Sequence, residues 1–166
     1  MKEKNKYQSA MSLVELLIVI SVFAILGVVV TSILTLTLRG SQKAESTIKV
    51  REDMNYAFSV IERNLRNAQE IDCDNSDIDT LTYLSHDGFS SSFSCTVGTD
   101  GFVSSGSARL TKNEVSIVFC EFSCIPSSSI IEPPVINVSL IAEDKESKSP
   151  TKSQVDITTQ IVARNY

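Results

Sequence analysis

The sequence is poor in the features that catalysis needs. It contains one histidine and none of the motifs GxSxG, HExxH, GxxxxGK[ST] and GxGxxG, which hold a nucleophile, a zinc ion, a phosphate or a dinucleotide. The lone histidine, His86, stands beside Asp87 in a stretch rich in serine and glycine, as an exposed loop residue would. We therefore predict a protein that is not an enzyme and that carries no cofactor.

Clustered basic residues are also scarce. The chain has 15 Lys and Arg against 20 Asp and Glu, a net charge of −5, and the one basic cluster is formed by Lys2, Lys4 and Lys6. A surface that binds nucleic acid needs grouped cations to contact the phosphates. The charge balance therefore predicts that the protein does not bind nucleic acid.

Charge is absent altogether from residues 16–38, which include no Asp, Glu, Lys, Arg or His. As an α-helix at about 1.5 Å per residue, this run extends roughly 34 Å, slightly more than the hydrocarbon thickness of a bilayer. It is too long for the apolar part of a cleaved secretory signal, and the absence of cysteine before Cys73 excludes a lipoprotein signal. A single membrane-spanning helix is predicted.

One carboxylate, Glu15, stands at the start of this apolar run. A charged side chain inside a bilayer costs about 2.5–3.5 kcal/mol on insertion scales, so intramembrane carboxylates tend to have a partner and a function. The simpler alternative places Glu15 among the lipid headgroups as a solvated residue. The residues around it favour a specific role.

Residues 9–20, SAMSLVELLIVI, resemble the prepilin signature of type IV pilins and of type II secretion pseudopilins. The resemblance implies a basic leader, residues 1–10, removed by a prepilin peptidase that cuts between Ala10 and Met11, with methylation of the new N-terminus. Glu15 becomes the fifth residue of the mature chain, where the family has Glu. The new α-amine of one subunit can pair with Glu15 of its neighbour, and such a pair inside an apolar bundle specifies register. Other pilin or pseudopilin subunits, the membrane and an inner-membrane assembly platform are the further implied partners.

No proline interrupts residues 12–68, so one helix is expected to continue over this range. Beyond residue 38 its apolar residues recur at steps of three and four, which predicts one buried face. The apolar residues are Ile48, Met54, Ala57, Phe58, Ile61, Leu65 and Ala68, and the charged residues at the other positions are Arg51, Glu52, Asp53, Glu62, Arg63 and Arg66. This stretch also resembles the corresponding part of minor pilins of the PilW and PulJ type.

Short strand-like runs separated by Gly, Ser and Asn follow the helix. They cover residues 81–84, 93–97, 107–110, 114–122, 135–141 and 154–163. In the fourth run Val115, Ile117 and Phe119 alternate with polar or smaller residues, which predicts that these three share one face. An antiparallel sheet of four or more strands packed on the amphipathic helix is the expected result.

These elements predict an α+β fold of the type IV pilin kind. The expected divisions are a leader at residues 1–10, a transmembrane helix at 11–38, an amphipathic continuation at 39–70 and a β-rich extracytoplasmic head at 71–166. The long helix packs on the small antiparallel head through its amphipathic half.

Cys73, Cys95, Cys120 and Cys124 are the only cysteines, and all lie in the predicted head. Their even number on the outer side of a membrane favours disulfides over a metal site, which would need more histidine or paired CxxC motifs. Three pairings are possible. The consecutive pairing, Cys73 with Cys95 and Cys120 with Cys124, is favoured here.

Asp72 and Asp74 begin like a calcium-binding loop. The sixth and twelfth loop positions are Asp77 and Tyr83, where the EF-hand has Gly and Glu. We therefore predict no metal site in the chain.

Two classes of function remain. The first is a structural subunit, a minor pilin or pseudopilin of a type IV pilus or a type II secretion-like filament, held in the cytoplasmic membrane with its C-terminal domain outside and carried into a surface filament on assembly. The second is a single-pass protein that displays a binding or adhesive head and does not assemble.

Overall fold

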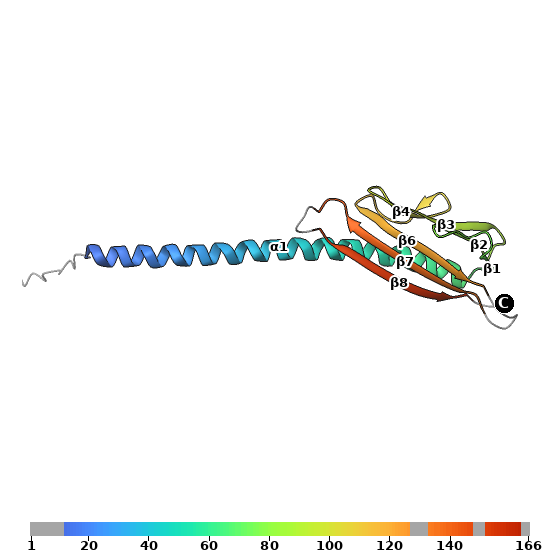
Figure 1. Cartoon of the computed structure of the whole chain (residues 1–166), viewed down its shortest axis with the longest axis horizontal. Coiled ribbons are helices and arrows are strands. Elements are labelled where there is room, and N and C mark those ends of the chain that lie inside the picture. The colour runs from blue at the N-terminus through green and yellow to red at the C-terminus, as the bar shows by residue number, and fades with distance from the viewer. Residues whose placement is uncertain (1–11, 127–132, 148–151, 164–166) are drawn as a thin grey trace, which may run out of the picture. The chain divides into compact units, whose positions relative to one another are not determined.

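The computed structural model describes residues 12–126, 133–147 and 152–163, and the chain divides into two compact units, residues 1–41 and 42–166. Helix α1 (Leu13–Arg66) supplies the described part of the first unit and continues into the second. The second unit, called the head below, contains the rest of α1 and all the strands (Figure 1). The predicted cleavage site, Ala10 and Met11, lies outside the described residues.

Helix α1 ends at Arg66, two residues before the predicted end. The amides of Asn67 and Ala68 donate to the carbonyls of Asn64 and Leu65 at 3.2 and 3.4 Å, and these three-residue steps tighten the last turn. Arg63 and Arg66 complement the helix dipole in that turn.

In the described part of the chain, eight strands follow α1, and every neighbouring pair is antiparallel. The strands of the first sheet, in the order β1-β2-β3-β4-β5, are β1 (Glu70–Asp72), β2 (Thr80–Leu84), β3 (Ser90–Thr96), β4 (Phe102–Ser105) and β5 (Ala108–Arg109). Those of the second sheet are β6 (Val115–Ile125), β7 (Val135–Asp144) and β8 (Gln154–Val162). Each predicted run overlaps one strand. Strands β1 and β4 were not predicted, and the strands form two sheets where one was expected.

The core lies between the head part of α1 and the two sheets. Buried residues from the helix and from both sheets form one cluster, which includes Met54, Ile61, Leu81, Ile117 and Leu140. The expectation of a long helix packed on antiparallel strands in an α+β fold is therefore confirmed.

Two positions on the helix differ from the predicted face. Ile48 was expected in the core, but its side chain is 57 % exposed, and Val50, two residues later, is fully buried. Asp53 was expected among the solvated charges, but it is only 3 % exposed. Its carboxylate accepts a hydrogen bond from the backbone N–H of Lys112 at 2.8 Å, which holds the segment between β5 and β6 against α1.

Strand β6 contains a β-bulge that changes which side chains face the core. Ile117 pairs with Ala142 and Phe119 pairs with Ile141, so Val118 has no partner on β7. The extra residue turns Phe119 outward, where it is 42 % exposed. The predicted alternation of Val115, Ile117 and Phe119 is therefore wrong at its last position.

A tight contact between glycine and β6 joins the two sheets. The Gly98 N–H donates to the Ile117 carbonyl at 3.0 Å, and the Ile117 N–H donates to the Gly101 carbonyl at 3.1 Å. A Cβ atom on Gly101 would lie 2.1 Å from the Ile117 carbonyl oxygen and 2.7 Å from that of Thr96. Only glycine fits this approach of two backbones.

The two disulfides join Cys73 to Cys124 and Cys95 to Cys120, with Cα–Cα distances of 5.5 and 6.5 Å. The favoured consecutive pairing is wrong. Cys120 and Cys124 lie on the same extended strand, where four residues span about 13 Å, well beyond the reach of a disulfide. Cys73 follows β1 and Cys95 lies in β3, so β2 separates them by about 10 Å.

Ion pairs around Lys49 connect α1 to the segment before β6 and to the segment after β7. Lys49 Nζ lies 2.9 Å from Glu114 Oε2 and 3.2 Å from Glu146 Oε2. These bonds raise the pKa of Lys49 to about 12. Nearby, the buried hydroxyls of Ser46 and Ser153 are hydrogen-bonded at 2.6 Å, which links α1 to the residue before β8.

Candidate functional site

The start of α1 places Glu15 in the first helical turn. The Leu16 N–H donates to the Ser12 carbonyl at 3.2 Å, which makes Ser12 the N-cap and Glu15 the third helical residue. Ser and Glu at this spacing form the capping-box pattern, in which their side chains serve free N–H groups of the first turn. The helix dipole also favours a carboxylate there. The sequence interpretation overlooked this S-x-x-E pattern, which is the local signal for a helix start at Ser12.

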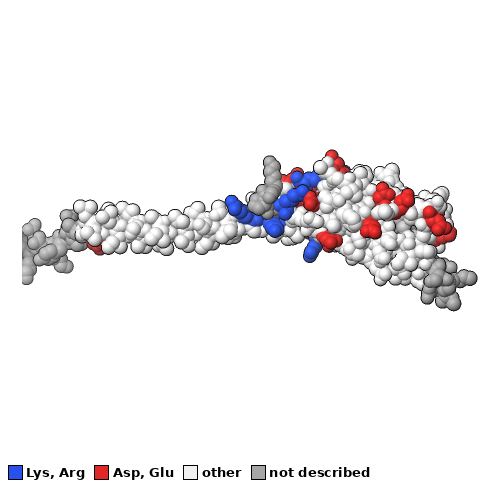
Figure 2. Space-filling view, viewed as in Figure 1, with Lys and Arg blue, Asp and Glu red and all other residues white. Residues whose placement is uncertain are grey.

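The following segment of α1 presents apolar side chains around its whole circumference. Every residue from 12 to 45 is exposed, and large apolar side chains such as Leu13, Phe23 and Val28 are 79, 74 and 69 % exposed. Residues 16–38 carry no charged side chain, and in Figure 2 they form a continuous white surface. A helix that is apolar all round requires an apolar surrounding, either lipid or other helices.

The hydroxyl groups of this segment are satisfied by the helix itself. Ser21, Thr31 and Ser32 donate to carbonyls three or four residues earlier at 2.7–2.9 Å, and Thr35 and Thr37 do the same. No partner outside the helix is needed for these groups, so they are compatible with an apolar surrounding. Glu15 is the one ionisable side chain between Ser12 and Arg39.

Helix α1 is also the one described helix whose length and composition would allow it to cross a membrane. Its apolar part carries no tertiary burial within the chain, unlike the core helix of a globular domain.

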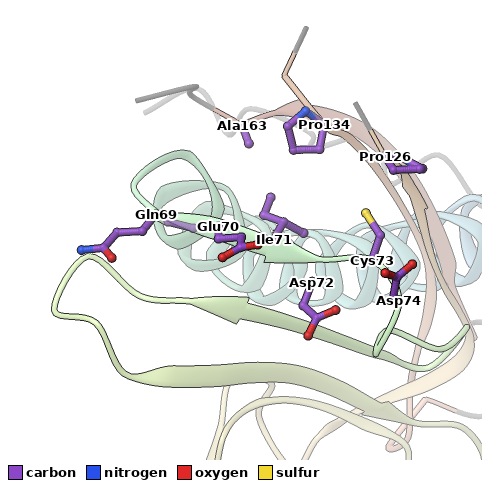
Figure 3. A pocket seen from close by; sticks show the side chains of 10 residues that line it. Gln69, Glu70, Ile71, Asp72, Cys73, Asp74, Pro126, Pro134 and Ala163 are labelled. Atoms are coloured by element: carbon purple, nitrogen blue, oxygen red, sulfur yellow. The ribbon is translucent and has the colours of Figure 1, made fainter. Parts of the chain in front are cut away.

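The head offers a shallow cleft of about 280 Å³ at the end of β1. Figure 3 shows it between residues 69–74 and the chain segments that carry Pro126, Pro134 and Ala163. Glu70, Asp72 and Asp74 make its border acidic, and the sulfur of Cys73 points toward the segments with the two prolines.

The acidic residues of this region serve the local turn. Asn75 donates its backbone N–H and its side-chain amide to the Asp72 carboxylate at 3.0 and 2.7 Å, which lowers the pKa of Asp72. Within the described residues, no group of three or more His, Cys, Asp or Glu side chains is placed to hold a metal ion.

Comparison with known families gives a match for the N-terminal part of the chain and none for the head. The model of the family described as Prokaryotic N-terminal methylation motif matches residues 5–31, which include the predicted cleavage site, Glu15 and the first part of the apolar segment. The chain is type IV pilin-like. Comparisons with curated proteins and with solved structures give no match.

The motif of this pilin-like chain implies processing by a prepilin peptidase. Pilins with this motif are typically structural subunits without enzymatic activity. An apolar N-terminal helix with this motif indicates a membrane-anchored prepilin with an extracellular head. The match ends at residue 31, so the head lies outside it, and the match gives no support to the PilW and PulJ subtype.

Proposed function

We propose that the chain is a minor pilin or pseudopilin, a structural subunit of a type IV pilus or a type II secretion-like filament. A prepilin peptidase cuts it between Ala10 and Met11. Residues 11–38 hold the mature chain in the cytoplasmic membrane with the head outside, until an assembly platform transfers it into the filament. The observation that carries this proposal is the methylation motif on a helical segment, residues 16–38, that is apolar all round and exposed throughout.

The apolar segment and Glu15 have separate tasks in assembly. The apolar side chains exchange lipid for the helices of neighbouring subunits. Their packing favours a bundle but does not fix how far one helix slides along another. The α-amine of Met11 in one subunit and Glu15 of the next supply opposite charges that are costly to bury singly. Their pairing selects one axial position, which is the best-attested use of a buried ion pair.

Substitutions at Glu15 separate this role from helix capping. Glu15→Gln keeps a residue that completes a capping box but removes the charge, whereas Glu15→Ala removes both. Glu52→Gln, at an exposed position in the head part of α1, is the matched control. All three variants should remain in the membrane. Filament fractions should contain the Glu52→Gln variant at the wild-type level and both Glu15 variants at less than a tenth of it.

Normal incorporation of Glu15→Gln would remove the charge-pairing role, and loss with Glu15→Ala alone would assign Glu15 to capping. N-terminal sequencing of protein from the native cell tests the processing step. The proposal expects a mature N-terminus at Met11. Retention of residues 1–10 in functional protein would favour the alternative, a single-pass protein that displays an adhesive head without assembly.

A further inference from the structure

The two disulfides of the head are nested. Cys95–Cys120, with a sequence separation of 25, lies entirely inside the loop closed by Cys73–Cys124, with a separation of 51. Cys95–Cys120 joins the second cysteine to the third, and Cys73–Cys124 joins the first to the last. Consecutive pairing is also incompatible with the folded head, because β2 separates Cys73 from Cys95 and an extended strand separates Cys120 from Cys124.

The order in which the cysteines are exported favours an initial bridge between Cys73 and Cys95, which the folded head does not contain. If the anchor enters the membrane before the head, as the proposed function requires, Cys73 and Cys95 reach the oxidising side before Cys120 and Cys124. A bridge between the first two is free to form while the chain is unfolded, and it must be exchanged before β1, β2 and β3 can align. This step alone rests on the proposed function.

The two native bridges differ in access. Cys95 and Cys120 are each 6 % exposed and belong to the core, together with Phe93 and Phe122, which lie two residues from them along β3 and β6. Cys73 and Cys124 are only partly buried, and Cys73 lines the cleft at the end of β1 (Figure 3). A thiolate must reach a sulfur atom to exchange it. In the folded head that access exists at Cys73.

We propose that Cys73–Cys124 is the bridge on which an extracytoplasmic thiol–disulfide oxidoreductase acts, with Cys73 as the attacked and attacking sulfur, and that it closes after Cys95–Cys120. Once the inner bridge has formed, the Cys73 thiolate attacks the disulfide of the oxidoreductase and releases one of its sulfurs as a thiolate. The Cys124 thiolate then attacks the Cys73 sulfur in the mixed disulfide. The second oxidoreductase sulfur leaves, the native bridge is closed, and two electrons have passed to the oxidoreductase while the two protein thiols have lost their protons.

The experiment uses the full chain in detergent, without any requirement for processing or assembly. The native protein is incubated with reduced glutathione, free thiols are alkylated at intervals, and mass spectrometry reports each cysteine. Cys73 and Cys124 should be modified at least ten times faster than Cys95 and Cys120. Equal rates, or earlier modification of Cys95 and Cys120, would overturn the assignment without affecting the proposed function.

Variants test the mixed disulfide. With oxidised glutathione as the probe, the Cys124→Ser variant should carry glutathione on Cys73, because the resolving thiol is missing. The Cys120→Ser variant is the matched control, and its Cys95 should stay largely unmodified while the head remains folded. Glutathione on Cys95 but not on Cys73 would refute the proposal. If either variant fails to fold, the rates measured on the native protein still decide it.

Discussion

The buried carboxylate of Asp53 leads to a prediction with a defined magnitude. Asp53→Ala leaves the Lys112 N–H without its acceptor at 2.8 Å, and an unsatisfied, partly buried donor costs about 1–2 kcal/mol. Asp53→Asn keeps an oxygen that can accept the same bond. Thermal unfolding of the full chain in detergent, followed by circular dichroism, should therefore show a midpoint roughly 3–8 °C lower for Asp53→Ala and an unchanged or higher one for Asp53→Asn.

The pH dependence gives the prediction a sign. Burial raises the pKa of Asp53 above its ordinary value of 3.8, against the opposing effect of the Lys112 hydrogen bond. The native state therefore binds this proton more tightly than the unfolded state. This tighter proton binding stabilises the native state below pH 3.8. The stabilisation is lost as the pH rises through the raised pKa of Asp53 in the native state. Relative to the wild type, Asp53→Asn should become more stable across that window and hold the difference at neutral pH.

Two results would contradict this reasoning. Equal destabilisation by Asn and Ala at neutral pH would mean that the charge itself, not the hydrogen bond, holds the segment between β5 and β6. A difference between Asp53→Asn and the wild type that does not change between pH 3 and pH 7 would mean that the carboxyl group does not titrate with a raised pKa.

Three further predictions follow from contacts in the head. Gly101→Ala forces two backbones apart and should cost about 2–3 kcal/mol, whereas Gly40→Ala, in open space on α1, should be neutral or stabilising in the same unfolding assay. Lys49→Gln should lower the free energy of unfolding by a small amount, and this difference should disappear in about 1 M salt. The stability that the Lys49 ion pairs give the wild type should be lost as the pH rises from 10.5 toward the Lys49 pKa of about 12. Cys95→Ser with Cys120→Ser should lower stability by about 3–4 kcal/mol in denaturant titrations, because it opens the inner loop of the unfolded chain.

Local patterns in the sequence were sufficient to predict much of the fold. The spacing of apolar residues along the helix predicted that Met54, Ile61 and Leu65 are buried, as they are. The alternation in residues 135–141 and 154–163 predicted strands, and β7 and β8 form there. The methylation motif was also readable, because its leader, its carboxylate and its apolar run are contiguous.

The errors arise where distant parts of the chain meet. The position of Asp53 depends on the arrival of Lys112, 59 residues later, and the outward turn of Phe119 depends on a bulge that only the pairing with β7 reveals. The disulfide pairing depends on the order of strands in the first sheet, which no local pattern specifies. At the N-terminus, the start of α1 at Ser12 is a local feature, and the S-x-x-E spacing alone would have predicted it.

The outer disulfide also determines how the head responds to mechanical load. Strands β2 to β5 lie wholly within the loop closed by Cys73–Cys124, so a pull between the N-terminal helix and the end of the chain passes through the bridge and bypasses them. The sequence separation of 51 between the two cysteines corresponds to roughly 180 Å of contour length at about 3.5 Å per residue, which tension cannot release while the bridge is intact. Single-molecule stretching should therefore show extension only from α1, β1, β7 and β8, and the missing length should appear after reduction.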